Sequence, residues 1–293
     1  MTRYDLRIGV VGLGAIGLPM AVNLHRSGFA LQVHTRSRTA ERSPELDGAM
    51  ACENPASAAQ NVDVLLICVS DDTAVQEVLF GADGAAASLG KGCVVLDCST
   101  IAPATAIHCA ERLASAGIHY LDAPVTGGSE GAVAGTLTLL VGGESAALER
   151  ARPVLEVIGS SIHHFGSVGM GQQVKAVNQV LVAGSYAAVA EAIALGQRLQ
   201  LPMDAVVAAL QQGAAGSWPL SHRSSAMLEG TYPLGFRLDL HHKDLTIALS
   251  SGRDVGLEMP VTDLVQQLEA ELISRGYGNE DVSTLRRFYD GRS

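Results

Sequence analysis

Lys175 is the residue of this chain whose setting most clearly indicates acid–base chemistry. It lies in an apolar segment that reads as a long helix, and Asn178, three residues later, shares its helix face. Lys175 falls near the predicted start of that helix, where the helix dipole favours anions over cations. A lysine at a position where the helix dipole disfavours a cation indicates a functional role for Lys175. The alternative is a surface lysine whose stem covers apolar neighbours.

A second chemical pattern follows a predicted strand that ends at Asp122. Thr126-Gly127-Gly128 offers a hydroxyl group and two unobstructed backbone amides, an arrangement that binds anions. The carboxylate of a small substrate fits such a nest of donors. A plain glycine turn is the alternative that these residues alone leave open.

A glycine-rich segment lies between the first predicted strand and the first predicted helix: Gly12-Leu13-Gly14-Ala15-Ile16-Gly17. In this setting the G-x-G-x-x-G pattern is typical of dinucleotide binding, although an ordinary glycine turn is the alternative. Gly12 permits a tight turn, Gly14 lets the backbone approach a pyrophosphate, and Gly17 lets helix and strand pack closely. The free amides and the positive end of the helix would hold the phosphate charge.

The end of the second predicted strand indicates which dinucleotide binds. An acidic residue there would favour NAD, but no carboxylate precedes Glu41. Arg36 can instead bind a 2′-phosphate through planar charge-assisted bonds, with Ser37 or Arg38 assisting. We therefore expect NADP(H) as the preferred cofactor and NAD(H) as the second choice, unless Arg36 is a solvated surface residue.

Elements that would position these residues alternate over the first 165 residues. The predicted strands cover residues 7–11, 30–34, 63–69, 93–97, 119–122, 136–141 and 161–164. The predicted helices cover residues 18–27, 73–80, 103–116 and 145–158. This rhythm predicts an α/β fold with a doubly wound, mostly parallel sheet of Rossmann type, covered by helices on both faces.

The chain changes character after Gly171, where only helices are predicted. One helix covers residues 172–199 and stops before Pro202, and an apolar face over 261–272 predicts another that ends near Gly276. We expect residues 1–165 to form an NADP-binding domain. Residues 166–293 should form an all-α domain for substrate binding and oligomerisation, which begins with a long interdomain helix.

Composition excludes several classes of protein. The 293 residues carry a net charge of −10 and are 47% hydrophobic, which excludes a disordered chain and argues against a nucleic-acid partner. Lys175 and Glu191 interrupt the apolar stretch 174–195, so we expect a buried helix and no membrane partner. The N-terminus lacks the apolar core of a signal peptide, and a cytoplasmic location follows as the expectation.

No metal site is expected. The five cysteines show no zinc-like spacing, and reduced, buried thiols are the simplest interpretation. The pairs His163-His164 and His241-His242 consist of adjacent residues, whose side chains diverge on a strand or a helix and do not share an ion.

Four spaced motifs together resemble the β-hydroxyacid dehydrogenase family over nearly the whole chain. The first is the glycine loop. The other three run from Asp122 to Gly128, from Gly169 to Asn178 (Gly-Met-Gly-Gln-Gln-Val-Lys-Ala-Val-Asn), and from Gly235 to Leu245 (Gly-Phe-Arg-Leu-Asp-Leu-His-His-Lys-Asp-Leu). The family includes 3-hydroxyisobutyrate dehydrogenases, tartronate semialdehyde reductases and glyoxylate/succinic semialdehyde reductases. Gln179 replaces the family's second asparagine and Thr126 its common serine.

The resemblance implies roles for residues of this chain. Lys175 matches the catalytic lysine, and Asn178 matches the asparagine that orients the substrate. Thr100 matches the threonine beside the nicotinamide ribose, and Val69 ends a strand next to the expected cofactor site. In the C-terminal half, Lys243 matches a lysine that reaches the cofactor. Phe236 and Asp244 match residues of the substrate cleft, and Trp218 either shapes the substrate pocket or packs in the core.

The expected activity is NADP(H)-dependent hydride transfer between the nicotinamide and a small 3-hydroxy acid or its semialdehyde. An imine reductase-like enzyme is one alternative, although such enzymes usually replace the lysine that Lys175 matches. A non-catalytic NADP-binding module is another. The expected partner is a small-molecule carboxylate substrate, and family members assemble through their helical domains, so a homodimer or homotetramer is also expected.

Overall fold

The computed structural model describes residues 6–290. The chain forms two compact units, and the division falls between Lys175 and Ala176, inside helix α7 (Met170–Arg198). We call these units the N-terminal unit and the C-terminal unit. The division at residue 165 stays a prediction about where the functional domains meet.

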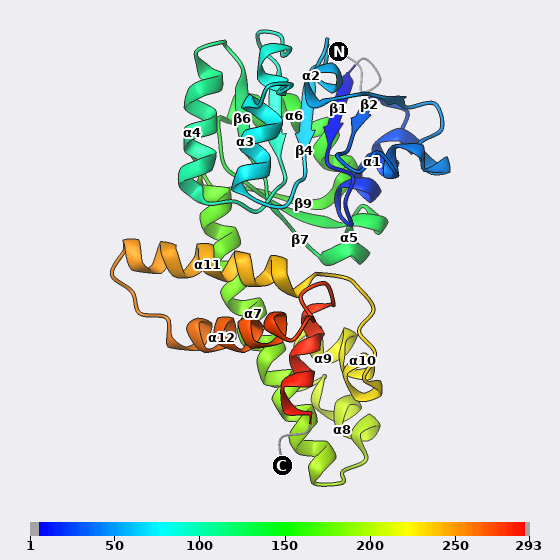
Figure 1. Ribbon diagram of the computed structural model, residues 1–293, viewed down its shortest axis with the longest axis vertical. Coiled ribbons are helices and arrows are strands. Elements are labelled where there is room, and N and C mark those ends of the chain that lie inside the picture. Colours follow the sequence, from blue (N-terminus) through cyan, green and yellow to red (C-terminus); the bar gives the residue numbers. More distant parts are fainter. Residues whose placement is uncertain (1–5, 291–293) are drawn as a thin grey trace. The chain divides into compact units, whose positions relative to one another are not determined.

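The N-terminal unit is built around a six-stranded parallel sheet (Figure 1). Its strands are β1 (Arg7–Val11), β2 (Ala30–His34), β3 (Met50–Ala51), β4 (Val64–Ile67), β5 (Val94–Asp97) and β6 (His119–Asp122). They lie in the order β3-β2-β1-β4-β5-β6, and each pairs in parallel with its neighbours. Strand order reverses between β1 and β4, which is where open α/β sheets bind ligands at their carboxyl ends. The predicted doubly wound α/β class is confirmed.

Helices cover both faces of this sheet, and alternate strand residues face the two layers (Figure 1). The helices are α1 (Gly17–Arg26), α2 (Pro55–Ala58), α3 (Asp72–Phe80), α4 (Pro103–Ala114), α5 (Gly128–Ala134) and α6 (Ser145–Ile158). Leu66 of β4 packs in the core with α1 and α6, whereas Leu65 packs with α3 and α4. Both faces are therefore apolar, as expected of a buried parallel sheet.

The strands after β6 form a second sheet of their own, which the sequence did not predict. Its order is β7 (Val125–Thr126), β8 (Leu137–Val141), β9 (Gly159–His164), with β7 antiparallel to β8. Pro124 follows β6 and has no amide hydrogen to extend the ladder, so the chain turns there. This turn directs Thr126-Gly127-Gly128 away from the main sheet.

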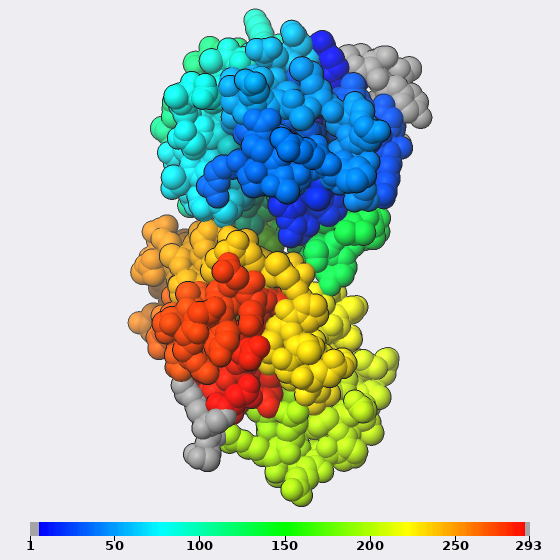
Figure 2. Space-filling model, turned by 45° about the vertical axis from the view of Figure 1, so that its right-hand side comes forward, coloured from blue at the N-terminus to red at the C-terminus, as the bar shows by residue number. Residues whose placement is uncertain are grey.

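Helices make up the C-terminal unit. After α7 come α8 (Met203–Leu210), α9 (Trp218–His222), α10 (Ser224–Glu229), α11 (Leu238–Asp254) and α12 (Pro260–Ser274), followed by a 3₁₀ segment, Val282–Tyr289. Their core contains Ala190 of α7, Leu245 of α11 and Val265 of α12. Figure 2 shows the red 3₁₀ segment at the surface of this unit, beside the orange α12 and the yellow α10.

Helix α7 is long and apolar enough to cross a membrane by length and composition alone. Core helices of soluble proteins pass the same test, and α7 supplies Ala183, Ala190 and Ile193 to the core of the C-terminal unit. The prediction of a buried helix holds for this face only, because 44% of the most apolar window is buried and Val177, Leu181 and Leu195 are exposed.

Candidate active site

The glycine loop follows β1 and has the conformation that a dinucleotide needs. Gly12 has a φ of +98°, and a Cβ there would lie 2.2 Å from the Cys68 carbonyl oxygen at the end of β4. A Cβ on Gly17 would lie 2.0 Å from the Gly12 carbonyl oxygen, so helix and loop need this glycine to pack. A Cβ on Gly14 would meet nothing within 4 Å, which leaves that backbone open to a pyrophosphate.

Two neighbouring strand ends lie next to this loop. Val69, after β4, donates its amide to Ser99 Oγ at 3.0 Å, and Thr100 follows directly. A Cβ on Gly12 would also lie 2.9 Å from the Val69 side chain. The structure therefore brings Gly12, Val69 and the segment before Thr100 together at the point where strand order reverses.

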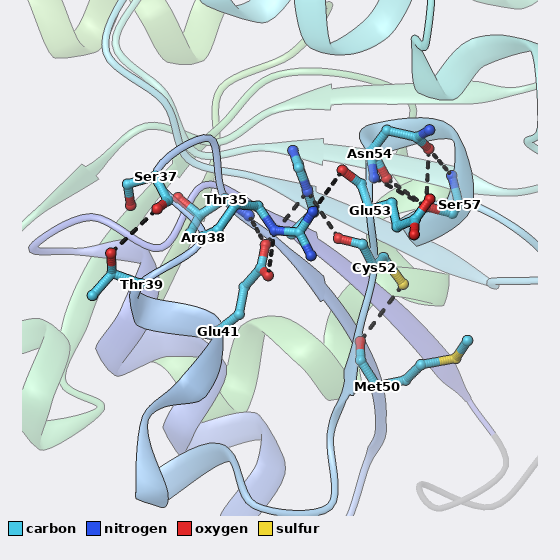
Figure 3. A network of polar contacts seen from close by, with 11 residues as sticks. Thr35, Ser37, Arg38, Thr39, Glu41, Met50, Cys52, Glu53, Asn54 and Ser57 are labelled. Carbon is cyan, nitrogen blue, oxygen red and sulfur yellow. Dashed lines mark hydrogen bonds and ion pairs between the residues drawn. The ribbon is translucent and has the colours of Figure 1, made fainter.

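Glu41 places a carboxylate at the end of β2, where the sequence alone indicated none (Figure 3). Its Oε1 accepts a hydrogen bond from the Thr35 amide at 2.6 Å, and its Oε2 accepts one from Arg38 Nε at 2.8 Å. The side chain is buried and returns from a 3₁₀ turn, Ala40–Arg42. Both oxygens are thus engaged by the loop itself, so this carboxylate differs from one that projects toward a ribose.

Arg36 and Arg38 have different surroundings, although both were predicted to meet a 2′-phosphate. Arg38 is held by Glu41, and its Nη1 donates to the Glu53 carbonyl oxygen at 3.0 Å. Arg36 is exposed, and within residues 6–290 its guanidinium has no hydrogen-bond or ion-pair partner. The geometry therefore favours Arg36 as the phosphate ligand and gives Arg38 a structural contact.

Lys175 lies against the segment that carries the predicted anion nest. Its side chain is 7% exposed, and Nζ donates to the Val125 carbonyl oxygen at 2.9 Å. Thr126 follows directly, and Gly127 and Gly128 both have positive φ, at +128° and +68°. The ammonium group is therefore held beside the proposed carboxylate donors.

An acidic side chain also lies at this nest. A Cβ on Gly128 would lie 2.9 Å from Glu130 Oε2, and that oxygen accepts a hydrogen bond from Ser129 Oγ at 3.1 Å. Glu130 is exposed, so water can reach and screen its charge.

Two buried residues that the sequence reasoning missed support this region. Asp122, at the end of β6, accepts hydrogen bonds from the Gly169 and Gln172 amides at 2.8 and 2.9 Å, which caps the start of α7. Gln172 is 1% exposed; it donates from Nε2 to the Ser99 carbonyl at 2.8 Å and accepts at Oε1 from the Ile101 amide at 3.2 Å. An aspartate at a strand end and a glutamine in the first turns of a helix were the only signals, and neither is specific.

Asp97, at the end of β5, is a buried carboxyl whose titration affects stability. Burial raises its pKa to about 6, against hydrogen bonds from Tyr120 and Ser99 that lower it. Burial likewise raises the pKa of Asp122 to about 6, and its bonds to the Gly169 and Gln172 amides oppose that rise. A pKa above the ordinary value means that the folded protein binds the proton more tightly than the unfolded chain does.

We expect Asp97→Asn to flatten the pH dependence of unfolding. In the wild type, the stabilisation from Asp97 is fully present below about pH 4 and is lost as the pH rises through about 6. The rise in pKa corresponds to roughly 3 kcal/mol for this group. Urea unfolding between these pH values measures it, with exposed Asp83→Asn as the control. Parallel curves for wild type and Asp97→Asn would contradict the assignment.

In the C-terminal unit, several predicted residues are joined by one polar chain. Asn178 donates to Gln179 Oε1 at 2.7 Å, and Gln179 donates to Asp244 Oδ2 at 2.7 Å. Lys243 Nζ lies 3.0 Å from Asp244 Oδ1. The structure therefore brings Asn178, Lys243 and Asp244 together, and Gln179, which replaces the family's asparagine, is the link between α7 and α11.

The two predicted aromatic residues have different environments. Phe236 packs edge-on against buried His241, with ring centroids 5.5 Å apart. Trp218 is 41% exposed, stacks on His222 at 4.5 Å and lies under the guanidinium of Arg223. Its exposure separates Trp218 from the core of this unit, and its role in a substrate pocket stays a prediction.

Comparison with known proteins agrees with this geometry. Residues 7–166 match the family described as the NAD binding domain of 6-phosphogluconate dehydrogenase. Residues 169–289 match the one described as NAD-binding of NADP-dependent 3-hydroxyisobutyrate dehydrogenase. The chain is 37% identical over 280 residues to 2-hydroxy-3-oxopropionate reductase of Escherichia coli strain K12, with 96% of each chain covered.

The solved structures similar to this chain fall into two groups. A crystal structure of 3-hydroxyisobutyrate dehydrogenase from Salmonella typhimurium is 30% identical, has a TM-score of 0.90, and covers 97% of this chain and 99% of its own. An imine reductase from Myxococcus stipitatus is 19% identical with a TM-score of 0.66, covers 97% of this chain and 99% of its own, and shows a shared fold alone. The chain therefore belongs to the β-hydroxyacid dehydrogenase family and is an NAD(P)-dependent dehydrogenase or reductase that acts on hydroxyl groups.

Proposed function

We propose that this enzyme uses NADP(H) to interconvert a small 3-hydroxy acid and its semialdehyde, with Lys175 as the general acid and base. One observation carries the proposal: the Lys175 ammonium is held on the Val125 carbonyl, one residue before Thr126-Gly127-Gly128. A proton donor is thereby fixed beside backbone amides suited to a carboxylate. A substrate that carries both a carboxylate and a nearby carbonyl would engage the two features at once.

The glycine loop and Arg36 fit the cofactor. Gly12, Gly14 and Gly17 leave space and amides for a pyrophosphate, and Arg36 offers an unengaged guanidinium beyond the end of β2. The 3-hydroxyisobutyrate dehydrogenases of the matching family are described as NADP-dependent, which supports the same choice. When bound, NADPH supplies the hydride that reaches the substrate carbonyl carbon.

Residues of the chain then stabilise the developing negative charge, transfer the proton and hold the substrate. As hydride adds to the carbonyl carbon, Lys175 polarises the carbonyl oxygen and donates a proton to the forming alkoxide, which yields the hydroxyl group. In the oxidising direction the neutral amine accepts the hydroxyl proton. Thr126 and the Gly127 and Gly128 amides hold the carboxylate, and Asn178 orients the substrate by hydrogen bonding. These roles belong to the proposal.

A substrate panel tests the proposal. NADPH oxidation is measured with tartronate semialdehyde, the semialdehyde of 3-hydroxyisobutyrate, succinic semialdehyde, glyoxylate and a cyclic imine. We expect turnover of the carboxylate-bearing carbonyl compounds and little turnover of the imine. A preference for the imine would favour an imine reductase-like enzyme. NADPH binding without turnover of any compound would favour a non-catalytic module.

The anion nest predicts that the substrate needs a free carboxylate. Methyl esterification leaves Thr126, Gly127 and Gly128 without a charged partner, and loss of a charge-assisted hydrogen bond costs about 1.5–3 kcal/mol. We expect kcat/KM to fall at least ~10-fold for the ester of the best substrate. The corresponding uncharged amide is a matched control of similar size. Equal turnover of acid and ester would show that the nest binds a different group.

The cytoplasmic location and the homodimeric or homotetrameric state stay predictions.

A further inference from the structure

Gln172 is a fully buried polar residue on α7, and the proposed reaction gives it no role. Its side chain is hydrogen-bonded on both sides of Thr100, to the Ser99 carbonyl and to the Ile101 amide. Its own amide is bound by Asp122 at the end of β6. One residue thus connects the ends of β5 and β6 to the first turns of α7.

Lys175 lies one helical turn after Gln172, so both side chains project from the same face of α7. Thr100 follows β5, the strand beside β4, and its neighbour Ser99 binds the amide of Val69, which lies against the glycine loop. A shift of Gln172 would therefore change the position of the β5 segment relative to Lys175. Gln172 is 1% exposed, so water cannot easily replace the two hydrogen bonds of its side chain.

We propose that Gln172 is a positioning residue that fixes the Thr100 segment relative to Lys175. This inference rests on the proposed function, in which Lys175 transfers the proton, and on the match of Thr100 to the family threonine beside the nicotinamide ribose. Asp122 anchors the backbone at Gln172, and the Gln172 side chain carries the alignment to Ser99 and Ile101. Hydride transfer depends steeply on such alignment, because a misplacement of about 1 Å can cost on the order of 10²-fold in rate.

The first test compares Gln172→Met with Gln173→Met. Methionine keeps the length of glutamine but neither bond, and Gln173 is the adjacent, exposed residue on the same helix. We expect kcat to fall at least ~10-fold in Gln172→Met and to stay near wild type in Gln173→Met. The NADPH dissociation constant should change less than about threefold, since the glycine loop and Arg36 hold the other end of the cofactor. Fluorescence titration measures binding, and NADPH deuterated at the transferred position shows that the hydride step is slowed.

Gln172→Glu decides the question if the methionine variant does not fold. A protonated glutamic acid accepts from the Ile101 amide and donates to the Ser99 carbonyl, whereas the ionised form has no donor. Because burial favours the protonated form, kcat of Gln172→Glu relative to wild type should rise as the pH falls. A role in packing alone would give a ratio that does not change with pH.

A double-mutant cycle with Thr100→Val tests whether Gln172 acts through the β5 segment. If it does, Gln172→Met lowers kcat less in the Thr100→Val background than in wild type. Additive effects, or a Gln172→Met enzyme with the kcat of Gln173→Met, would overturn the inference. A wild-type enzyme that turns over no carbonyl compound while binding NADPH would instead overturn the proposed function, so the two failures are distinguishable.

Discussion

Lys175→Ala should lower kcat for carbonyl reduction by about 10²–10⁴-fold, the range typical of a general acid–base group. The reason is that Lys175 donates to the Val125 carbonyl and is thereby held beside Thr126-Gly127-Gly128, where the proposed reaction needs a proton donor. NADPH affinity should change little, because the glycine loop and Arg36 belong to the other end of the cofactor. Steady-state kinetics with the best substrate of the panel, together with NADPH titration, measures both quantities.

Two variants separate proton transfer from packing. Lys175→Met keeps an apolar stem in the buried site and should be as inactive as Lys175→Ala, because both lack the ammonium group. Lys91→Ala removes an exposed lysine of the same unit and should leave kcat unchanged. A Lys175→Ala enzyme that keeps more than about a third of wild-type kcat, with chemistry rate-limiting, would remove Lys175 from the mechanism.

Most of the main sheet could be predicted because its strands and helices leave local patterns. Runs such as the one in β4 are apolar throughout, as both faces of the sheet are buried. Strands β3 and β7 have two residues each, which is too short for any alternation, and they were not predicted. The separate sheet that contains β7 was also missed. Its antiparallel pairing depends on the turn after Pro124, which no local pattern of strand residues indicates.

The site residues also differ in whether a local sequence pattern can predict them. The glycine loop and Thr126-Gly127-Gly128 are contiguous, so spacing alone indicates their chemistry. Gln172, by contrast, binds Ser99 across 73 positions of sequence, and Asp122 binds Gly169 across 47. A buried glutamine or aspartate has no local signature until the fold brings its partners near, because the same residue types are common on surfaces.

Glu41 shows how a local rule can be incomplete. The absence of a carboxylate between His34 and Glu41 pointed to NADP(H), and the fold then returns the Glu41 carboxylate to the end of β2. Glu41 is buried and its two oxygens bind Thr35 and Arg38, so this carboxylate is turned into the loop and not toward a ribose. The sequence named Arg36 as the phosphate ligand with Ser37 or Arg38 assisting, and the contacts of Arg38 with Glu41 and Glu53 give Arg38 a structural role.

Arg36→Asp should therefore weaken NADPH strongly and leave NADH use nearly intact. A bidentate contact to the 2′-phosphate is worth about 1.5–3 kcal/mol, so wild type should prefer NADPH roughly 10- to 150-fold in kcat/KM. Aspartate removes that attraction and adds like-charge repulsion. Because Arg36 is exposed, the preference should also shrink at high salt, where screening weakens the phosphate contact.

Matched arginine variants make this test specific to one side chain. Arg36→Met should lose most of the NADPH preference without new repulsion, and Arg42→Met, at an exposed arginine of the same segment, should keep it. Arg38→Met removes the arginine partner of the buried Glu41 carboxylate, so it should lower the unfolding temperature more than it lowers the preference. If wild type used both cofactors equally, Arg36 would face solvent rather than phosphate. If Arg38→Met abolished the preference while Arg36→Met kept it, the phosphate ligand would be Arg38.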